Sequence, residues 1–547
     1  MRRLASTAAI AVAFLPLIFP TASASASART TEDPDPVPVQ QVGPGQYLSD
    51  TGVFKISETD VSAGLIGRKH GVIAVDGGLA RPQSAPPARP DLSVFGPGWQ
   101  AEFLGGTINR KLEVQSGAVL VTDLAEGESV RYELRSSVSF PGGGGVQRYE
   151  APDGSKVTET TRWDSAAGAM RTSISETVAT KLGDQQLEEG DDAFTDADGA
   201  PLSSAALNLT YSWTRLDGLQ SADTWRVTGL GNTAHGTSSV GYDAQGRVST
   251  IREPAAGDVP EELLTVHYAT ATTATAAAFG DYAGRLKEIT ITSGATAPQT
   301  VARYGYDPSG LLRTMINPST DASPQATYAY DAVGRLSSVD SRDLGGWQLS
   351  FAAGSAVPTA TSTDPGRPVP GGPIQGYDPD TTGPAPGEFL PGDVSGVQAN
   401  PRTCYYAYTW LWYTRAECYS AWVAHYGWRK PAWKQLPTRA WVVGIKHDHC
   451  TSAPDKPSGF DFRSACDMHD YGYGLIGNVY RHYIRWLDIG RKLDVDSLFH
   501  VTLRDYTCPA YSKIKRPLCR SYAYTYWKAV KARGNPRNGA NATPVDT

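Results

Sequence analysis

The chain has 547 residues, more than one hydrophobic core usually organises, so we expect two or three domains. Hydrophobic residues make up 40% of the chain, and its net charge is −6. Beyond the N-terminus no stretch approaches the roughly 18 unbroken apolar residues of a membrane-spanning helix, which excludes helical membrane spans there and predicts a soluble protein.

The charge is divided unevenly. Residues 1–400 contain 28 Lys and Arg against 45 Asp and Glu, whereas residues 401–547 contain 22 against 11. An acidic part therefore precedes a basic module. A basic surface on a secreted module suits anionic partners, such as lipid headgroups, nucleic acid or the acidic part of the same chain. Ordinary solvated charge is the alternative.

Residues 1–28 have the form of a secretory signal peptide. Arg2 and Arg3 precede a short apolar run from Leu4 to Pro20, and small residues that offer Ala-x-Ala cleavage sites follow from Thr21 to Ala28. We therefore expect the protein to be secreted into the extracellular space.

Residues 29–230 are expected to form a β-rich region. After a segment rich in Pro, Gly and Ser, apolar and polar residues alternate over Leu112–Thr122, Ser129–Phe140 and Ala206–Trp213, and Gly and Asp turns bound these segments. A period of two is typical of antiparallel strands with one buried face.

An internal repeat occupies residues 231–350. Its copies are Gly241–Val248, Gly305–Leu312 and Ala329–Leu336, with a degenerate copy at Asp281–Leu286. Each copy predicts a strand, a tight turn and a second strand, because Asp caps the turn and Gly supplies the positive φ. Such units stack into a β array, since none can bury a face alone.

The repeat resembles the YD (Rhs) repeats. Members of that family build β shells and often carry a variable effector domain at the C-terminus, so the resemblance implies a β scaffold in front of a separate functional module. Unrelated hairpins that share common turn residues are the alternative interpretation.

A Pro/Gly-rich linker is predicted over residues 351–400. In residues 401–533 the apolar spacing becomes helical, with one stripe around Asp496 and another from Cys519 to Val530. The predicted fold is therefore multidomain, with a mainly antiparallel β part and an all-α, disulfide-bonded C-terminal domain. A disordered tail is expected at residues 534–547.

All six cysteines lie in the C-terminal module, and an even number in an exported module implies disulfides. Many pairings are possible for six cysteines. Sequential pairing closes short loops and predicts the bridges Cys404–Cys418, Cys450–Cys466 and Cys508–Cys519.

The clearest chemical motif begins at Cys466. On a helix, His469 and Asp470 lie three and four residues further along the same face. A bridge from Cys450 would hold the preceding loop, with Asp448, against that face. Two carboxylates with main-chain carbonyls and waters suit Ca²⁺.

A neighbouring imidazole could take a proton from water while the cation polarises an ester carbonyl. Such a base needs an acceptor on its other ring nitrogen, and Asp496 on the following helix is the candidate. The sequence therefore predicts calcium-assisted ester hydrolysis with His469 as the base.

The ordered motifs Asp448-His449-Cys450, Cys466-x-x-His469-Asp470-Tyr471 and Val495-Asp496-Ser497 resemble the small secreted phospholipase A2 family of bacteria and fungi. The resemblance covers roughly residues 440–533. It implies that His469 is the general base oriented by Asp496. It also implies that Asp448, the main-chain carbonyl of His449 and Asp470 bind Ca²⁺, and that the bridges Cys450–Cys466 and Cys508–Cys519 form.

The implied reaction is hydrolysis of the sn-2 ester of glycerophospholipids at a membrane surface. Basic residues would favour anionic membranes: Arg485, Arg491, Lys492, Lys513, Lys515 and Arg516. An intramolecular contact between the acidic β part and the basic module is a further expectation, and no nucleic acid partner is expected.

Alternatives remain at this stage. A zinc site could use His447, Asp448, His449, Cys450, Cys466 and His469, although thiolates are not expected in an exported protein. The chain could also be a binding or adhesion protein with little turnover, or a toxin whose effector is masked by the β part. The remaining histidines of the module, His425, His482 and His500, are interpreted as surface or packing residues.

Overall fold

The computed structural model describes residues 36, 39–75, 79–84, 89–219, 224–257, 259–320, 322–363, 406–412, 431–445, 448–479 and 489–534. The predicted signal peptide, most of the linker, the Cys404–Cys418 bridge and nearly all of the tail lie outside these residues. In the described part of the chain, no helix has the length and hydropathy that crossing a membrane requires.

The first sheet in the described residues has six antiparallel strands. They are β1 (Gln40–Val42), β2 (Gly45–Leu48), β3 (Val53–Val61), β4 (Ile66–Ala74), β5 (Ala80–Pro82) and β6 (Trp99–Glu102). Strands β1 to β5 pair in chain order, and β6 pairs with β4. Phe54 and Ile56 lie two residues apart in β3 and are both buried, as expected where alternate residues point to one face.

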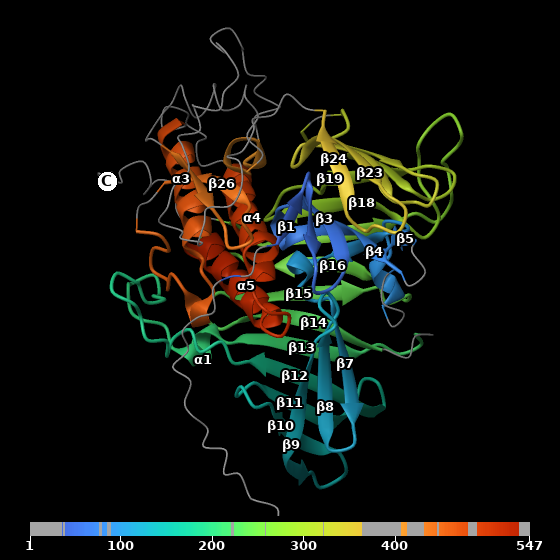
Figure 1. Cartoon of the computed structure of the whole chain (residues 1–547). Coiled ribbons are helices and arrows are strands. Elements are labelled where there is room, and N and C mark those ends of the chain that lie inside the picture. Colours follow the sequence, from blue (N-terminus) through green and yellow to red (C-terminus); the bar gives the residue numbers. More distant parts are fainter. Residues whose placement is uncertain are drawn as a thin grey trace, which may run out of the picture. The chain divides into compact units, whose positions relative to one another are not determined.

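A second, longer sheet follows, in which each described strand pairs antiparallel with the next (Figure 1). Its strands are β7 (Arg110–Gln115), β8 (Ala118–Asp123), β9 (Ser129–Ser139), β10 (Gly145–Glu150), β11 (Lys156–Asp164), β12 (Ala169–Val178), β13 (Leu209–Arg215), β14 (Trp225–Asn232), β15 (Gly236–Tyr242), β16 (Val248–Glu253), β17 (Glu262–Tyr268), β18 (Leu286–Ser293), β19 (Gln299–Tyr306), β20 (Leu312–Ile316), β21 (Ala326–Tyr330), β22 (Leu336–Ser341), β23 (Gly345–Phe351) and β24 (Pro358–Ser362). The short helix α1 (Ser204–Leu207) precedes β13. Strand β24 lies within the segment expected to be linker.

The predicted strand Leu112–Thr122 is two strands, β7 and β8. They form a hairpin in which Gln115 pairs with Ala118. Gly117 has φ 76° in the turn, a conformation that a glycine adopts without a steric cost. The alternating pattern continues across the hairpin, which is why it could not separate the two strands.

The repeat units are hairpins closed by the same turn. The Oδ1 atoms of Asp243, Asp307 and Asp331 accept main-chain N–H bonds of 2.9 to 3.1 Å from the residues two and four positions later. The glycine three positions after each Asp has a φ between 75° and 86°. These contacts are local, which explains why a short motif could predict them.

Tyrosines join neighbouring units. The hydroxyls of Tyr268, Tyr306 and Tyr330 donate 2.7 to 2.8 Å bonds to the main-chain carbonyl of the aliphatic residue that closes the preceding unit. This recurring bond ties each hairpin to the previous one. Membership of the YD family stays a prediction.

The degenerate unit is assembled differently from its predicted motif at residues 281–286. Ala269, directly after Tyr268, occupies the position that Asp holds in the other units. Its main-chain N–H donates to the carbonyl of Arg285, and Gly284 donates back to the Ala269 carbonyl. An insertion between residues 270 and 283 separates the two halves of the turn, so the sequence motif aligned the wrong tyrosine.

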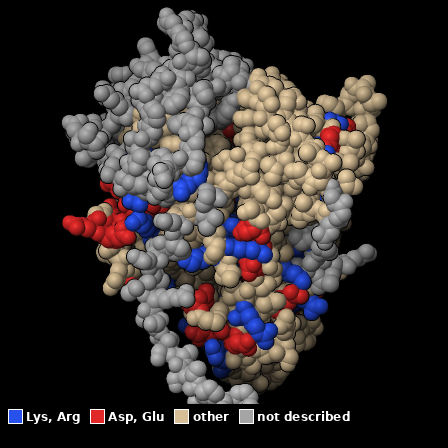
Figure 2. Space-filling model, viewed as in Figure 1, with Lys and Arg blue, Asp and Glu red and all other residues tan. Residues whose placement is uncertain are grey.

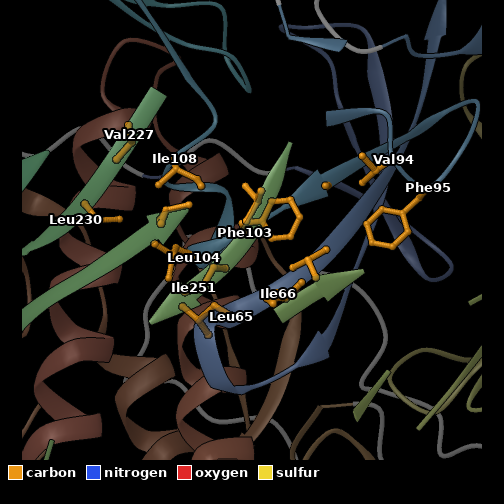
Figure 3. Packing of buried hydrophobic residues seen from close by; sticks show 14 of the residues in the cluster. Leu65, Ile66, Val94, Phe95, Phe103, Leu104, Ile108, Val227, Leu230 and Ile251 are labelled. Atoms are coloured by element: carbon orange, nitrogen blue, oxygen red, sulfur yellow. The ribbon is translucent and has the colours of Figure 1, made fainter. Parts of the chain in front are cut away.

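The main hydrophobic core lies between the two sheets. Figure 3 shows Leu65 and Ile66, next to and within the first sheet, near Ile251 of β16 and Leu230 of β14, with Leu104 from the segment after β6. All five side chains are 2% exposed or less. The core therefore joins the N-terminal sheet to the middle of the long sheet.

The C-terminal region is not the all-α domain that the sequence predicted. Its described residues contain the helices α3 (Arg463–Val479), α4 (Ile489–Tyr506) and α5 (Arg516–Arg533), which lie side by side (Figure 1). They also contain a β-hairpin, β25 (Ala432–Gln435) and β26 (Trp441–Gly444). The hairpin packs on α3 through buried aromatic and aliphatic residues, and its turn includes Arg439 at φ 69°. Its strands have only four residues each, too short for a period of two to stand out.

Helix α5 is anchored on the β part by buried ion pairs. Lys528 lies 2.9 Å from Glu253, and Lys531 lies 3.2 Å from Glu253 and 3.1 Å from Glu262. Two further side chains of α5, Tyr524 and Trp527, belong to the main core. Figure 2 shows basic and acidic side chains adjoining on the surface that it draws. Part of the basic excess of the C-terminal region therefore neutralises acidic residues of the β part.

Two of the basic residues predicted to favour anionic membranes are not on the surface. Lys492 and Arg516 are buried, with 8% and 4% exposure, and Arg516 pairs with Glu126 at 2.9 Å. Lys513 pairs with Glu128 at 3.1 Å. Lys515 is exposed, whereas the side chains of Arg485 and Arg491 lie outside the described residues.

Candidate active site

The structure brings His469 of α3 and Asp496 of α4 together, 27 positions apart in the sequence. Nε2 of His469 lies 3.0 Å from Oδ1 of Asp496, and both side chains are buried. A carboxylate accepts hydrogen bonds, so Nε2 carries the proton and Nδ1 is left as the basic nitrogen. The imidazole is flanked by the rings of Tyr473 and Phe499, with centroids 4.2 and 4.7 Å away.

Two further groups hold Asp496. The Tyr473 hydroxyl donates to Oδ1 at 2.7 Å, and the Lys492 ammonium donates to Oδ2 at 2.7 Å. Burial by itself would raise the pKa of Asp496, but Lys492 and the hydrogen bond from His469 outweigh it and lower this pKa. Asp496 is therefore an anion that can orient His469 and stabilise positive charge on it.

Lys492 also joins α4 to the end of α5. Its ammonium donates to the main-chain carbonyls of Val530 and Lys531 at 2.9 and 3.1 Å. These carbonyls lie in the last turn of α5, where a cation is favourable. The sequence analysis assigned Lys492 to a membrane-facing surface, although its spacing of four residues from Asp496 could have indicated the ion pair.

The Cys450–Cys466 bridge forms and holds the loop that precedes α3 against the helix. The second expected bridge, Cys508–Cys519, also forms and joins the residues after α4 to α5. Because Cys450 and Cys466 are oxidised, their sulfurs are not thiolates, which removes the zinc site proposed on those residues. His447, also part of that alternative, lies outside the described residues.

Asp470 is half-buried and has an unusual environment for a carboxylate. Within the described residues, its Oδ2 atom is buried and has no hydrogen-bond partner. Burial, and after it the negative charge of Asp448, raise the pKa of Asp470 well above its usual value. A buried oxygen without a donor is unfavourable, and a cation held between Asp448 and Asp470 would compensate it.

Two residues of the loop complete the predicted cation ligands. Asp448 is exposed and accepts a 2.7 Å bond from the Thr451 hydroxyl. His449 has φ 57°, and its Nδ1 lies 2.8 Å from Oδ1 of Asp467. Its carbonyl accepts a bond from Thr451 N–H at 3.2 Å, which leaves a second lone pair for a cation. No group of three or more His, Cys, Asp or Glu side chains in the described residues could hold a metal, so a cation here would depend on carbonyls and waters as well.

A cavity of about 680 Å³ opens beside His469 and Asp470. Apolar side chains of α4 and α5 line part of it: Phe499, Tyr526, Ala529 and Val530. Residues Phe194–Ala197 of the β part also line it. Nothing in their sequence indicated this role, because they meet the site only through the tertiary fold.

Two comparisons with known proteins match this region. Residues 421–534 match the family model described as prokaryotic phospholipase A2. A stretch of 91 residues is 37% identical to a secretory phospholipase A2 of Arthroderma benhamiae. That stretch is 16% of this chain and spans 57% of the relative. Both comparisons support a domain of phospholipase A2 type at the C-terminal end of the chain, and with it a lipolytic hydrolase.

Proposed function

We propose that this protein is a secreted, calcium-dependent phospholipase A2 that hydrolyses the sn-2 ester of glycerophospholipids. The observation that carries the proposal is the buried His469–Asp496 pair beside a largely apolar cavity. Secretion is supported by the form of residues 1–28 and by the name of the relative, a secretory phospholipase A2.

The residues fit a calcium ion. Asp448, Asp470 and the main-chain carbonyl of His449 would hold it, and the unpartnered Oδ2 of Asp470 supports this assignment. When bound, Ca²⁺ supplies polarisation of the ester carbonyl and stabilisation of the negative charge on its oxygen.

His469 acts as general base through Nδ1. It accepts a proton from a water molecule while the water oxygen attacks the ester carbonyl carbon. Asp496 keeps the ring oriented through Nε2 and stabilises the imidazolium. When the carbon–oxygen bond to the glycerol backbone breaks, the imidazolium returns the proton to the departing oxygen. The products are a fatty acid and a lysophospholipid.

The direct test uses the full chain and phosphatidylcholine vesicles labelled at either the sn-1 or the sn-2 acyl chain. We expect the sn-2 fatty acid to be released in calcium and not in chelator. Equal release from both positions would contradict the proposed specificity. Equal rates with calcium and with chelator would contradict the proposed cofactor, and no release at all would leave a binding or adhesion role.

A further inference from the structure

We infer that a loop of the β part, residues 183–201, forms a wall of the substrate cavity and sets the acyl-chain preference of the enzyme. This inference rests on the proposed function. The loop connects β12 to α1 and will be called the wall loop. It lies far upstream of residues 421–534, which match the phospholipase A2 family model.

The wall loop is bound to the segment that precedes α3. The Gln185 side chain donates to the carbonyl of Lys456 at 3.0 Å and accepts from the N–H of Ser458 at 3.1 Å. The N–H of Ser452 donates to Oδ2 of Asp192 at 2.9 Å. Two main-chain N–H groups of this segment, those of Ser452 and Ser458, thus find their acceptors in the β part.

Phe194 anchors the wall loop in the core of the C-terminal region. It is 3% exposed, and its ring packs edge-on against Tyr526 with centroids 5.0 Å apart. Tyr526 in turn packs against Phe462 at 4.9 Å. The loop is therefore fixed to the helices that carry the site.

The tip of the wall loop is a small ordered turn. Oδ1 of Asp196 accepts the N–H groups of Asp198 at 3.0 Å and Ala200 at 2.8 Å. The N–H of Leu202 donates to the carbonyl of Phe194 at 2.7 Å. These bonds hold Phe194–Ala197 in place where they line the cavity.

The shared lining indicates the ligand class. Phe194 and Ala197 line the same cavity as Tyr526, Ala529 and Val530, so an aliphatic chain would contact apolar groups from both parts of the protein. His469 and Asp470 line that cavity too, which makes the acyl chain of the reacting ester the natural occupant. A wall of this kind selects chain length by the space that it leaves.

The test places a large side chain in the cavity by a substitution at an exposed position of the wall loop. Ala197 is exposed and lines the cavity, so Ala197→Trp narrows the cavity with little effect on folding. Ala200, exposed in the same turn, is not a lining residue, and Ala200→Trp is the matched control. Melting curves of both variants check that the fold is kept.

The readout is kcat/KM for a series of phosphatidylcholines with short to long acyl chains, presented in the same mixed micelles. We expect Ala197→Trp to lower the ratio of long-chain to short-chain kcat/KM by about tenfold, with Ala200→Trp within about twofold of wild type. An unchanged ratio in Ala197→Trp, or an equal change in both variants, would overturn the inference while leaving the phospholipase activity intact.

A binding measurement separates the two proposals. Displacement of a fluorescent fatty acid from the full chain is measured for wild type and both variants. One outcome is that wild type releases no fatty acid from lipids but binds the probe, and that Ala197→Trp alone weakens this binding. That result would support the wall loop as part of the cavity and would contradict the proposed function. Absence of both hydrolysis and probe binding would overturn the wall as well.

Discussion

Glu176 of the β part and Asp470 of the helical region differ in how their carboxylate charges are compensated. Glu176 of β12 is fully buried and accepts two bonds of 2.8 Å from Arg110, with further bonds from Tyr132 and Trp213. Asp470 of α3 is half-buried, and its buried Oδ2 atom has no described donor. A carboxylate whose oxygens all have donors stabilises the fold. A carboxylate oxygen without a donor can be retained where a ligand supplies the missing partner. The comparison contrasts a carboxylate that holds the fold with one whose unpartnered oxygen suits a ligand.

The largest expected effect breaks the site and leaves the β part intact. His469→Gln removes the basic nitrogen but keeps a side chain that can donate to Asp496. We expect kcat for phospholipid hydrolysis to fall by about 10²–10⁴-fold, because a general base contributes about that much. The melting temperature should stay close to that of wild type. His267, exposed on β17, is the matched control, and His267→Gln should leave both measurements unchanged. A variant of His469 that keeps its rate would refute the assigned base.

The next largest effect is on stability rather than on activity, and it concerns the ion pairs between α5 and the β part. Glu253→Gln leaves the buried Lys528 without its ion-pair partner, while Lys531 keeps its pair with Glu262. Removing one partner of a buried pair costs about 3–5 kcal/mol. We expect that loss in the free energy of unfolding, measured in denaturant. Glu261→Gln is the control, because Glu261 forms an exposed pair with Arg252. Equal stability of the two variants would show that the α5 anchor contributes nothing.

The same carboxylate gives a pH dependence of defined sign. Burial would raise the pKa of Glu253, but Lys528 and Lys531 lower it to about 2 from 4.5. Its stabilisation is therefore complete above pH 4.5 and is lost as the pH falls towards 2. Between these values the unfolding free energy of wild type should fall more steeply than that of Glu253→Gln, and parallel curves would argue against the ion pairs.

Calcium should stabilise the helical region through Asp470. An ion that binds only the folded state adds about 2.7 kcal/mol when its concentration is 100 times its dissociation constant. We expect calcium to raise the melting temperature of wild type, and Asp470→Asn to lose this rise. Asp217→Asn, at an exposed residue of the β part, should keep it. A calcium-induced rise that survives in Asp470→Asn would place the cation elsewhere.

The smallest effect tests the support of Asp496. Tyr473→Phe removes one hydrogen bond, while the bonds from His469 and Lys492 remain. A single bond of this kind contributes about 1 kcal/mol, so we expect a loss of roughly fivefold in kcat. The loss should appear in kcat rather than in KM if Tyr473 acts by positioning Asp496, and a change confined to KM would indicate contact with lipid.

The anchoring of α5 also bears on the masked-effector hypothesis. Release of the C-terminal region would expose Tyr524 and Trp527, which are fully buried in the main core. It would also separate Lys528 and Lys531 from their buried partners. These contacts therefore favour a β part that stays bound to the C-terminal region and completes the site. They argue against a β part that releases this region as an effector.

Local patterns made part of the geometry of the candidate site predictable. His469 and Asp470 follow Cys466 at helical spacing, and the loop bridge to Cys450 forms as expected. The Asp and Gly of the repeats form the expected turns, because each turn is closed by atoms only a few residues apart. The sequence did not predict the hairpin β25–β26, because strands of four residues are too short for a clear pattern. It also placed the degenerate repeat unit at 281–286 and missed its other half at Ala269, because an insertion separates the two.

The sequence by itself determined the helix face that carries His469, the two described disulfides and the turn chemistry of the repeats, because spacing along the chain dictates which neighbours meet. Only the tertiary structure decided that Lys492 is buried against Asp496, that α5 is held by Glu253, and that Phe194–Ala197 line the cavity. Such contacts join residues distant in the chain, and they follow from how whole elements pack rather than from any local pattern.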